Sequence, residues 1–369
     1  IMDGHCSEDQ IAEFLLALRA KGETVAEVAG AAAALRRHVT PIRTTRRDTI
    51  DTCGTGGDGS RTFNISTTAA LVTAAAGVPV AKHGNRGITS RSGSADVLAA
   101  LGVNIEAEVA CVEACLDELG ICFCFAPLLH RAMRHVAPVR KRLGVPTIFN
   151  ILGPLANPAG SPYQLLGVGR AKLQPLMAEA LALLGARRAV VVHGSDGLDE
   201  VTLAGPTRVV ETAEGELRAG HWNPADFGLS CRSLESLVVD GPLQSAAIVQ
   251  QVLRGERGAA RDIVILNAAA ALWTAGRGAT LAESRQLAEE SLDTGAAHDL
   301  LARLLRAAGA NAQRAQAARI GDGSRQRGRG RAGHGGLDDG MAHAQSGHPR
   351  GLCGAHTTPC FLSRIHALM

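Results

Sequence analysis

From residue 49 onward the chain repeats one pattern, in which a short apolar stretch leads into a polar loop and then into an alanine-rich helical stretch. The pattern predicts strands over residues 49–53, 78–81, 103–106, 121–125 and 188–193. One more strand could lie in the last part of the chain. The pattern predicts helices over residues 66–76, 94–101, 109–119, 176–184, 246–253, 263–273 and 281–308. Strands that alternate with helices form a mostly parallel sheet with helices on its faces. The expected fold class is therefore α/β.

Two segments stand apart from this pattern. Residues 11–37 have helical periodicity, with Gly22 ending a first helix and residues 25–37 forming a second. Residues 127–158 interrupt the alternation and end in the turn sequence NILGPLANP. We therefore predict a small helical domain over residues 1–48, with a helical contribution from residues 127–158, and an α/β domain over residues 49–310.

The most informative polar loop covers residues 82–102 and reads KHGNRGITSRSGSADVLAALG. It combines Lys82 with Gly84, Gly87, Gly93 and several hydroxyl side chains ahead of a helix. Glycine lets a backbone turn tightly and approach a ligand, and N–H groups at a helix start attract anions. The loop therefore suits phosphate, although by itself it also fits a plain turn between a strand and a helix.

A second loop of this kind follows the first predicted strand. Residues 51–58 read DTCGTGGD, and residues 64–67 read NIST, which places hydroxyl groups beside an amide. One helix separates the two loops, so they follow consecutive strands. Ligands of open α/β sheets bind at neighbouring strand ends, and we expect one binding site to be built from both loops.

Charged residues elsewhere extend this site. Asp199 and Glu200 follow a glycine turn after the strand over residues 188–193, and paired carboxylates suit Mg²⁺, which prefers oxygen ligands and is often shared with phosphates. An ordinary acidic turn is the alternative. The basic residues between positions 130 and 142 could hold an acidic substrate, or they could form a solvated helix face.

Composition argues against several other classes of protein. The net charge of +3 is too small to indicate a nucleic-acid partner, and no uninterrupted apolar run is long enough to span a membrane. The nine cysteines show no metal-binding spacing, so we interpret them as reduced thiols of a cytoplasmic protein. Residues 311–369 form a tail that contains no valine, lysine or glutamate from residue 321 onward, and this composition predicts disorder.

Taken in order, the motifs resemble those of the anthranilate phosphoribosyltransferase family. They are GTGGD at residues 54–58, NIST at 64–67, KHGNR at 82–86, SRSGSADVL at 90–98, NILGPLANP at 150–158 and DE at 199–200. The resemblance covers residues 2 to 308. One departure lies at residues 144–149, which read GVPTIF, with Pro146 where the family usually has arginine.

This resemblance implies a nucleoside phosphorylase-like phosphoribosyltransferase fold, with a small N-terminal helical domain beside a large α/β domain. It implies transfer of the phosphoribosyl group of 5-phosphoribosyl 1-pyrophosphate to the amino group of anthranilate. The products would be N-(5-phosphoribosyl)anthranilate and pyrophosphate, in a step of tryptophan biosynthesis. It also implies two Mg²⁺ ions and a cytoplasmic homodimer joined through the helical domain, with no membrane or nucleic-acid partner.

Site residues follow from the resemblance residue by residue. Those expected to bind phosphoribosyl pyrophosphate are Gly54, Gly57, Asp58, Thr62, Asn64, Ser66, Thr67, Lys82, Asn85, Arg86, Ser90 and Ser94. Those expected to bind metal are Ser66, Asp199 and Glu200. Those expected to meet anthranilate are Gly54, His83, Asn85, Gly153 and Arg140, with Arg140 facing its carboxylate. No acid or base is expected, because the aniline nitrogen has a free lone pair and the leaving pyrophosphate mainly needs charge neutralisation.

Two other functions remain open at this point. A pyrimidine nucleoside phosphorylase of the same fold would use inorganic phosphate and would not need the pair Asp199 and Glu200. A non-catalytic nucleic-acid-binding relative would use the basic loops and the arginine- and glycine-rich tail, which the small net charge supports only weakly.

Overall fold

The computed structural model describes residues 1–87 and 92–307. Residues 88–91 and 308–369 lie outside this described part, so the prediction of a disordered tail over residues 311–369 concerns residues that are not described. Among the residues that are described, no helix is both long enough and apolar enough to cross a membrane.

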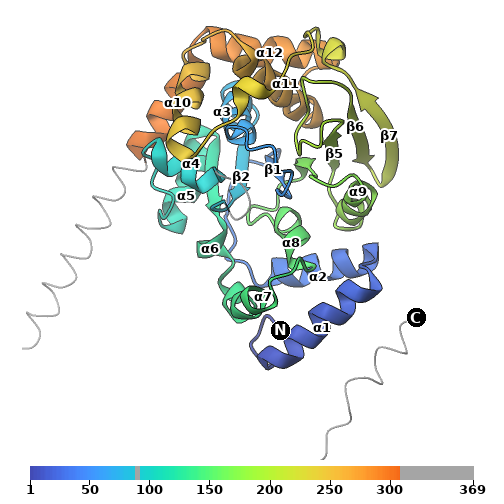
Figure 1. The fold of residues 1–369 in the computed structure, drawn as a ribbon. Helices are drawn as coiled ribbons and strands as arrows, with labels where there is room; N and C mark the ends of the chain where they lie inside the picture. The colour runs from blue at the N-terminus through green and yellow to red at the C-terminus, as the bar shows by residue number, and fades with distance from the viewer. Residues whose placement is uncertain (88–91, 308–369) are drawn as a thin grey trace, which may run out of the picture. The chain divides into compact units, whose positions relative to one another are not determined.

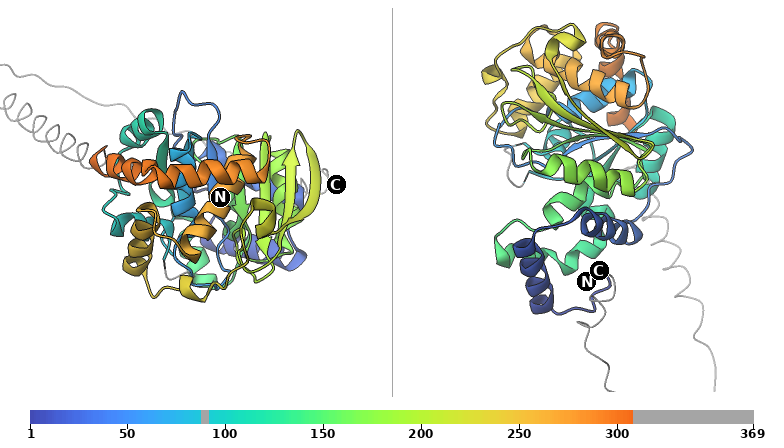
Figure 2. Two further views of the ribbon diagram at one scale, coloured as in Figure 1. Left: turned by 90° about the horizontal axis from the view of Figure 1, so that it is seen from above. Right: turned by 90° about the vertical axis from the view of Figure 1, so that its right-hand side faces the viewer.

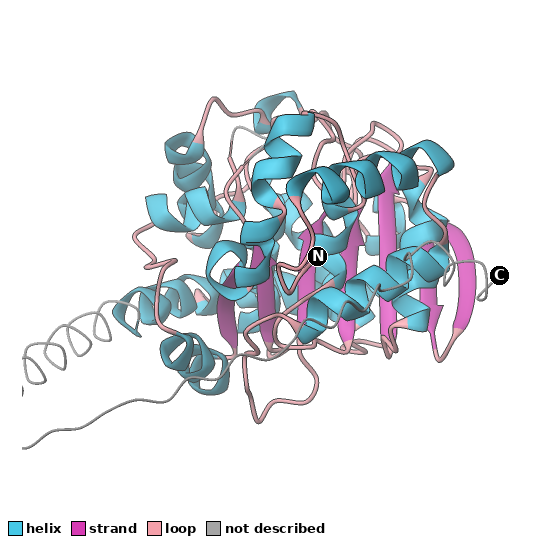
Figure 3. Cartoon of the chain, turned by 90° about the horizontal axis from the view of Figure 1, so that it is seen from below, coloured by secondary structure: helices cyan, strands magenta, loops and turns pink. Residues whose placement is uncertain are grey.

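A seven-stranded sheet forms the centre of the α/β part, with the order β3-β2-β1-β4-β5-β6-β7 (Figures 1 and 3). Its strands are β1 (Ile50–Gly54), β2 (Val80–Gly84), β3 (Ile121–Phe125), β4 (Tyr163–Gly167), β5 (Arg188–Gly194), β6 (Thr207–Ala213) and β7 (Glu216–Trp222). Strands β1 to β5 are parallel to one another, whereas β5 pairs with β6, and β6 with β7, in antiparallel fashion. The prediction of a mostly parallel sheet is therefore confirmed.

Both faces of the central strands are buried. In β5, Val190 and Val192 belong to one hydrophobic cluster, whereas Ala189 and Val191 belong to another. Side chains alternate between the two faces of a strand, so an apolar run such as AVVV can fill two cores at once. In the right-hand view of Figure 2, α9 lies on one side of the strands and α11 and α12 lie on the other.

Helices surround the sheet and form the N-terminal part of the chain. They are α1 (Glu8–Lys21), α2 (Val25–Arg37), α3 (Ile65–Ala75), α4 (Ser94–Ala100), α5 (Val109–Leu119), α6 (Ala126–Leu129), α7 (Ala137–Leu143), α8 (Phe149–Leu152), α9 (Leu173–Leu183), α10 (Pro242–Leu253), α11 (Ala259–Thr274) and α12 (Leu281–Asp293). Residues 296–307 are also helical. Short 3₁₀ turns are η1 (Arg131–His135), η2 (Gly153–Leu155), η3 (Pro224–Phe227) and η4 (Glu235–Leu237).

The two N-terminal helices start and stop at strong local signals. Ser7 and Thr24 each cap a helix and form a capping box, and Gly22 ends α1 with a φ of 86°. Helix α1 packs on α7, and α2 packs on α8 and α9 (Figure 1). Arg36 of α2 donates through Nε to the carbonyl of Leu155 over 2.7 Å. Residues 127–158 thus pack against the N-terminal helices.

Two predicted elements are wrong. Residues 103–106 form no strand: residues 103–104 are irregular, residues 105–106 lie in a turn, and the Asn104 side chain accepts the N–H of Glu106 over 3.1 Å. Val103 and Ile105 are buried, so their alternation reflects core packing without a neighbouring strand. The helix predicted over residues 281–308 is interrupted after α12, where Gly295 has a φ of 77°.

The sequence does not predict β4, β6 and β7 as separate strands. It indicates only that one more strand could lie in the last part of the chain. Strand β4 is short and inserts between β1 and β5. Strands β6 and β7 form a hairpin at the sheet edge, where β7 is exposed over nearly its whole length. A strand that is exposed on both faces shows no apolar alternation, so its sequence carries little strand signal.

Candidate functional site

The chain changes direction across the sheet between β1 and β4. It runs outward from β1 to β2 and β3 and then returns to β4 on the other side of β1. Ligands of open α/β sheets bind at such a switch point. A cavity of about 280 Å³ is lined there by the loops after β1 and β2 and by Asp199 and Glu200.

This cavity brings together most of the residues predicted to bind ligands. They are Gly54, Gly57, Asp58, Thr62, Asn64, Ser66, Lys82, His83, Asn85, Arg86, Ser94, Asp199 and Glu200. Thr67, Gly153 and Arg140 do not line it, and Ser90 lies outside the described residues. Ser60 and Arg61 also line the cavity, although they were not predicted as site residues.

The segment that carries Asp199 lies directly against the ends of β1 and β4. A Cβ atom on Gly54 would overlap the Asp199 carboxylate, and one on Gly167 would overlap the Asp199 carbonyl group. The N–H of Gly56 donates to Asp199 Oδ2 over 2.9 Å. Glycine at both strand ends therefore lets this carboxylate reach the cavity. Gly167 was missed because its strand was not predicted.

Asp199 and Glu200 are half-buried, and Asp58 lies close enough to act on both electrostatically. Removal from water, followed by the charge of Asp58, raises the pKa of Asp199. Removal from water, followed by the charge of Asp199, raises the pKa of Glu200, whereas Lys82 and a hydrogen bond with Ser66 oppose that rise. Crowded carboxylates of this kind favour a bound cation, because a cation relieves their repulsion.

The donor atoms at this place fit Mg²⁺. Ser66, Asp199 and Glu200 offer only oxygen atoms, which Mg²⁺ prefers. In the described part of the chain, no group of three or more His, Cys, Asp or Glu side chains could hold a metal ion by itself. Mg²⁺ usually keeps several waters and binds through one or two carboxylates and substrate phosphates, so a pair of carboxylates is sufficient.

Lys82 places a buried cation at the cavity. Its side chain is 3% exposed, and Nζ donates to the Thr52 carbonyl over 2.5 Å and to Ser66 Oγ over 3.3 Å. A buried ammonium group is stable only with hydrogen-bond and charge partners, and Glu200 and Asp51 supply negative charge nearby. The lysine is therefore held in place before any ligand binds.

The loop after β1 is anchored at its far end. Asn64 caps α3, because its Oδ1 accepts the N–H of Thr67 over 3.0 Å, and its own N–H donates to Ser245 Oγ over 2.9 Å. Thr67 Oγ1 is buried with no hydrogen-bond partner among the described residues. Arg61 has a φ of 57°, which is uncommon for a residue other than glycine. Sequence alone carries no signal for that conformation.

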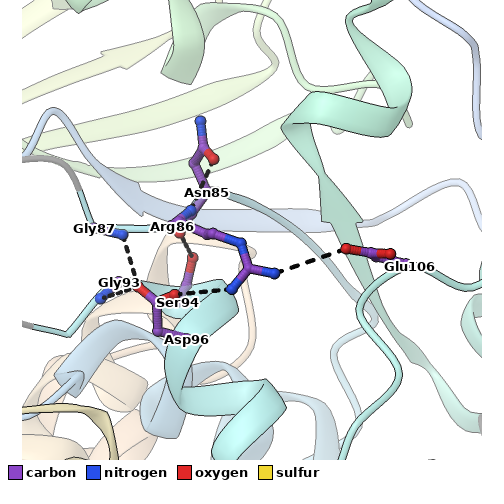
Figure 4. Close-up of polar contacts among 7 residues, drawn as sticks. All are labelled: Asn85, Arg86, Gly87, Gly93, Ser94, Asp96 and Glu106. Atoms are coloured by element: carbon purple, nitrogen blue, oxygen red, sulfur yellow. Dashed lines mark hydrogen bonds and ion pairs between the residues drawn. The ribbon is translucent and has the colours of Figure 1, made fainter.

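The loop after β2 is closed by a carboxylate from the first turn of α4 (Figure 4). Asp96 Oδ2 accepts the N–H groups of Gly87 and Gly93 over 2.8 and 3.2 Å. The Arg86 guanidinium lies 3.3 Å from Asp96 Oδ1 and 3.7 Å from Glu106 Oε1. Arg86 therefore lines the cavity while its guanidinium is paired with two carboxylates.

His83 and His130 form a buried pair at one side of the cavity. Their Nε2 atoms are 3.0 Å apart. Burial, together with the neighbouring ring, lowers the pKa of His83 to about 3, and burial lowers the pKa of His130 to about 4. Both rings are therefore neutral near pH 7, so one donates and the other accepts. The main-chain N–H of His83 also donates to Asp51 Oδ1 over 3.0 Å.

Arg140 lies on α7, outside the lining of this cavity. It is half-buried, which lowers its pKa, and its side chain has no hydrogen bond or ion pair with another described residue. A half-buried guanidinium without a partner suits a carboxylate ligand. Gly153 starts η2, and its backbone interacts with the His83 ring. The turn over residues 150–158 therefore contacts the cavity through His83.

Comparison with known proteins agrees with this geometry. Sequence models described as "Glycosyl transferase family, a/b domain" and "Glycosyl transferase family, helical bundle domain" match residues 46–298 and 1–39. The anthranilate phosphoribosyltransferase of Anaeromyxobacter sp. (strain Fw109-5) is 53% identical over 306 residues, which are 83% of this chain and 90% of that relative. The chain belongs to the anthranilate phosphoribosyltransferase family.

Solved anthranilate phosphoribosyltransferases share the fold as well. The Thermus thermophilus enzyme has a TM-score of 0.79 at 47% identity, over 83% of this chain and 92% of that one. The Saccharomyces cerevisiae enzyme in complex with PRPP and Mg has a TM-score of 0.75 at 32% identity, over 82% and 86% of the two chains. That yeast enzyme was also solved with 4-fluoroanthranilate. The predicted family and fold are therefore confirmed.

Proposed function

We propose that the protein transfers the phosphoribosyl group of 5-phosphoribosyl 1-pyrophosphate to the amino group of anthranilate, as a step of tryptophan biosynthesis. The observation that carries this proposal is the meeting of two glycine-rich loops, Lys82 and the pair Asp199 and Glu200 in one cavity. Such loops and a fixed cation suit phosphate groups, and the carboxylates suit the metal that accompanies them. The names of the relatives support the same reaction.

The phosphoribosyl pyrophosphate would bind mainly through the two loops. The residues proposed for it are Gly54, Gly57, Asp58, Thr62, Asn64, Ser66, Thr67, Lys82, Asn85, Arg86, Ser90 and Ser94. Phosphate oxygens accept hydrogen bonds from backbone N–H groups, from hydroxyl groups and from the cationic side chains of Lys82 and Arg86. Thr67 would act through the first turn of α3, because its hydroxyl does not line the cavity.

Two Mg²⁺ ions are proposed, with Ser66, Asp199 and Glu200 as their protein ligands. The yeast relative was solved with PRPP and Mg. When bound, Mg²⁺ neutralises charge on a leaving pyrophosphate. Lys82 and the backbone N–H groups of the loops would donate hydrogen bonds to the oxygen atoms of the pyrophosphate and hold the ribose in one orientation.

The anthranilate would lie between Arg140 and the cavity. The Arg140 guanidinium can pair a carboxylate through two parallel hydrogen bonds. Gly54, His83, Asn85 and Gly153 are proposed to line the path of the ring. The amino nitrogen attacks the anomeric carbon as the bond to pyrophosphate breaks, and it then releases a proton to solvent. The lone pair of an aniline needs no strong base, which agrees with the low pKa values of His83 and His130.

We also propose that residues 1–48, together with residues 127–158, form a small domain through which the protein dimerises. Helix α1 leaves Phe14 and Leu16 exposed by 49% and 44%, although its Ile11, Leu15 and Leu18 are buried. Apolar side chains of this size on one short helix are suited to a contact with a second subunit.

A fluorescence assay tests the proposed reaction. Purified protein is mixed with phosphoribosyl pyrophosphate, Mg²⁺ and anthranilate, and the loss of anthranilate fluorescence is followed. We expect consumption that depends on all three components. Phosphorolysis of a pyrimidine nucleoside with no anthranilate consumption would instead assign a phosphorylase. Salt-dependent nucleic-acid binding without turnover would assign a binding protein.

A further inference from the structure

Asp96 was not among the predicted site residues, although it contacts residues that line the cavity. Asp96 is the third residue of α4, and among the described residues its carboxylate accepts hydrogen bonds from three donors (Figure 4). Two are the N–H groups of Gly87 and Gly93, at 2.8 and 3.2 Å, and both meet Oδ2. The third is Arg86 Nη1, which lies 3.3 Å from Oδ1.

Helix capping explains only one of these contacts. A carboxylate at this position of a helix commonly accepts the N–H of the capping residue, which here is Gly93. Glu27 has that role in α2, where it accepts the N–H of Thr24, and its partners all lie within six residues. Asp96 also bonds Gly87 and Arg86, which precede it by nine and ten residues. Its carboxylate therefore joins the two ends of the loop after β2.

The two ends of this loop are in direct contact. A Cβ atom on Gly93 would overlap the Gly87 nitrogen, so only glycine allows this approach. The carbonyl of Asn85 accepts the N–H of Ala95 over 3.2 Å and Ser94 Oγ over 3.3 Å. Asn85, Arg86 and Ser94 all line the cavity. Gly87 and Gly93, which Asp96 contacts together with Arg86, line it as well, so Asp96 holds residues that line the cavity.

Arg86 is also oriented by Asp96. Its side chain is 54% exposed and would be free to move without partners. Asp96 is only 21% exposed and is fixed by the two N–H groups, so it is a rigid acceptor for the guanidinium. Glu106 is 63% exposed and lies farther away, at 3.7 Å. Exposed ion pairs of this kind contribute little. Asp96 is therefore the better-fixed of the two carboxylate partners of Arg86, whose guanidinium also lies over the Phe125 ring, 5.8 Å from the ring centroid.

We propose that Asp96 is a positioning residue for phosphate binding, which links Gly87 and Gly93 through Oδ2 and orients Arg86 through Oδ1. This inference rests on the proposed function, because it names phosphoribosyl pyrophosphate as the ligand. A side chain that is oriented before binding loses less conformational freedom when the ligand arrives, so affinity rises. Asp96 itself does not line the cavity and acts only through its neighbours.

Replacing Asp96 by asparagine separates its two roles. In Asp96→Asn the amide oxygen can still accept both N–H groups, whereas the NH₂ group cannot accept a hydrogen bond from Arg86. We expect the Kd and KM for phosphoribosyl pyrophosphate to rise about tenfold, since hydrogen bonds between charged groups are the stronger ones. The kcat, the KM for anthranilate and the melting temperature should stay near those of the wild type. Asp96→Ala loses both roles, and we expect a larger rise in Kd and a lower melting temperature.

Calorimetric titration with phosphoribosyl pyrophosphate and Mg²⁺, without anthranilate, measures the effect independently of turnover. Asp96→Asn should cause no further loss in an Arg86→Gln background, because the two side chains act as one unit. Glu27→Gln is the matched control, as it makes the same change at a helix cap remote from the cavity, and it should bind like the wild type.

Three results would overturn the proposal. They are unchanged binding by Asp96→Asn, tighter binding, which would mean that Asp96 competes with phosphate for Arg86, and an equal loss in the Arg86→Gln background. A wild-type protein that neither binds nor turns over phosphoribosyl pyrophosphate would overturn the proposed function and this inference together. A wild type that does both, beside an unaffected variant, would overturn this inference alone.

Discussion

At the residue scale, the pair Asp199 and Glu200 carries the most specific chemistry in the chain. Two half-buried carboxylates with raised pKa values repel each other unless a cation lies between them. Such an arrangement is unfavourable for stability and is therefore better explained by binding. The local sequence DE shows the residue types, but only their position against Gly54 and Gly167 shows that they reach the cavity.

Asp199→Asn combined with Glu200→Gln should abolish most of the activity and leave the fold intact. We expect turnover to fall by at least about a hundredfold, because metal neutralisation of a leaving group is worth several kcal/mol. Without Mg²⁺, the melting temperature should stay the same or rise, since repulsion is removed. The measurements are steady-state rates at limiting Mg²⁺ and a thermal melt. Near-normal turnover would remove these carboxylates from the proposed metal site.

Arg140→Ala should impair the use of anthranilate more than the use of phosphoribosyl pyrophosphate. We expect the KM for anthranilate to rise by about tenfold or more, because alanine cannot replace the paired hydrogen bonds of a guanidinium. Kinetics with each substrate varied in turn measure this difference. Arg142→Ala is the control on the same helix, since Arg142 already pairs with Glu8 and Asp9 at the surface. Equal losses for both substrates would place Arg140 elsewhere.

At the scale of elements, the ends of β1 and β4 decide whether the site can form. The two strands are paired along their whole length, and they end together at Gly54 and Gly167. The segment after β5 crosses these ends and brings Asp199 to the cavity. Because the overlap at Gly167 would be with main-chain atoms, it cannot be relieved by a rotamer change.

Gly167→Ala should therefore disturb both stability and function. We expect the free energy of unfolding to fall by about 2 kcal/mol or more, as for other overpacked sites, and turnover to fall with it. Gly220→Ala is the matched control, because Gly220 lies in β7 with open space around it, and its effect should stay within about 0.5 kcal/mol. Chemical denaturation and the anthranilate assay measure both. A Gly167→Ala enzyme of normal stability and activity would contradict the packing argument.

At the scale of the whole molecule, the buried pair His83 and His130 links stability to pH. Their folded-state pKa values of about 3 and about 4 lie below the ordinary 6.5, so the unfolded chain takes up protons first as the pH falls. The stability that the neutral pair contributes is complete above pH 6.5 and is lost below it. Between pH 6.5 and 5 the expected loss is about 3 kcal/mol.

His130→Gln tests this linkage, because it removes one of the two titrating rings. The free energy of unfolding is measured with urea at pH 7 and at pH 5. The loss between these pH values that comes from the histidines should be about half as large in the variant as in the wild type. Asp51, Asp199 and Glu200 have raised pKa values and oppose the trend, so the difference between the two proteins isolates the histidines. Equal losses in both proteins would contradict the assignment.

Assembly is a second property of the whole molecule. If α1 forms the subunit contact, a protein with Phe14→Glu and Leu16→Glu should be a monomer where the wild type is a dimer, because two buried charges without partners are unfavourable. Analytical ultracentrifugation measures this. Leu243→Glu is the control, since Leu243 is 79% exposed on α10. A monomeric wild type, or a control that dissociates equally, would contradict the proposed contact.

Several local features of the fold and of the site can be predicted from the sequence alone. The loops GTGGD and KHGNR, the NIST motif and the neighbouring acids at 199 and 200 are local features. Local turns, caps and periodicities depend on consecutive residues, so they can be predicted without knowledge of the fold. The α/β class and most helices were predicted for the same reason.

Only the tertiary structure decided the rest, because it depends on contacts between residues far apart in the chain. The insertion of β4 beside β1, the need for glycine at Gly167 and the pairing of His83 with His130 all depend on residues that are distant in the sequence. The pairing of Arg86 with Asp96 is also not predictable from the sequence, since the two residues are ten positions apart and meet only in the folded chain. Residues of these kinds carry no local signal, and long-range packing alone determines what they do.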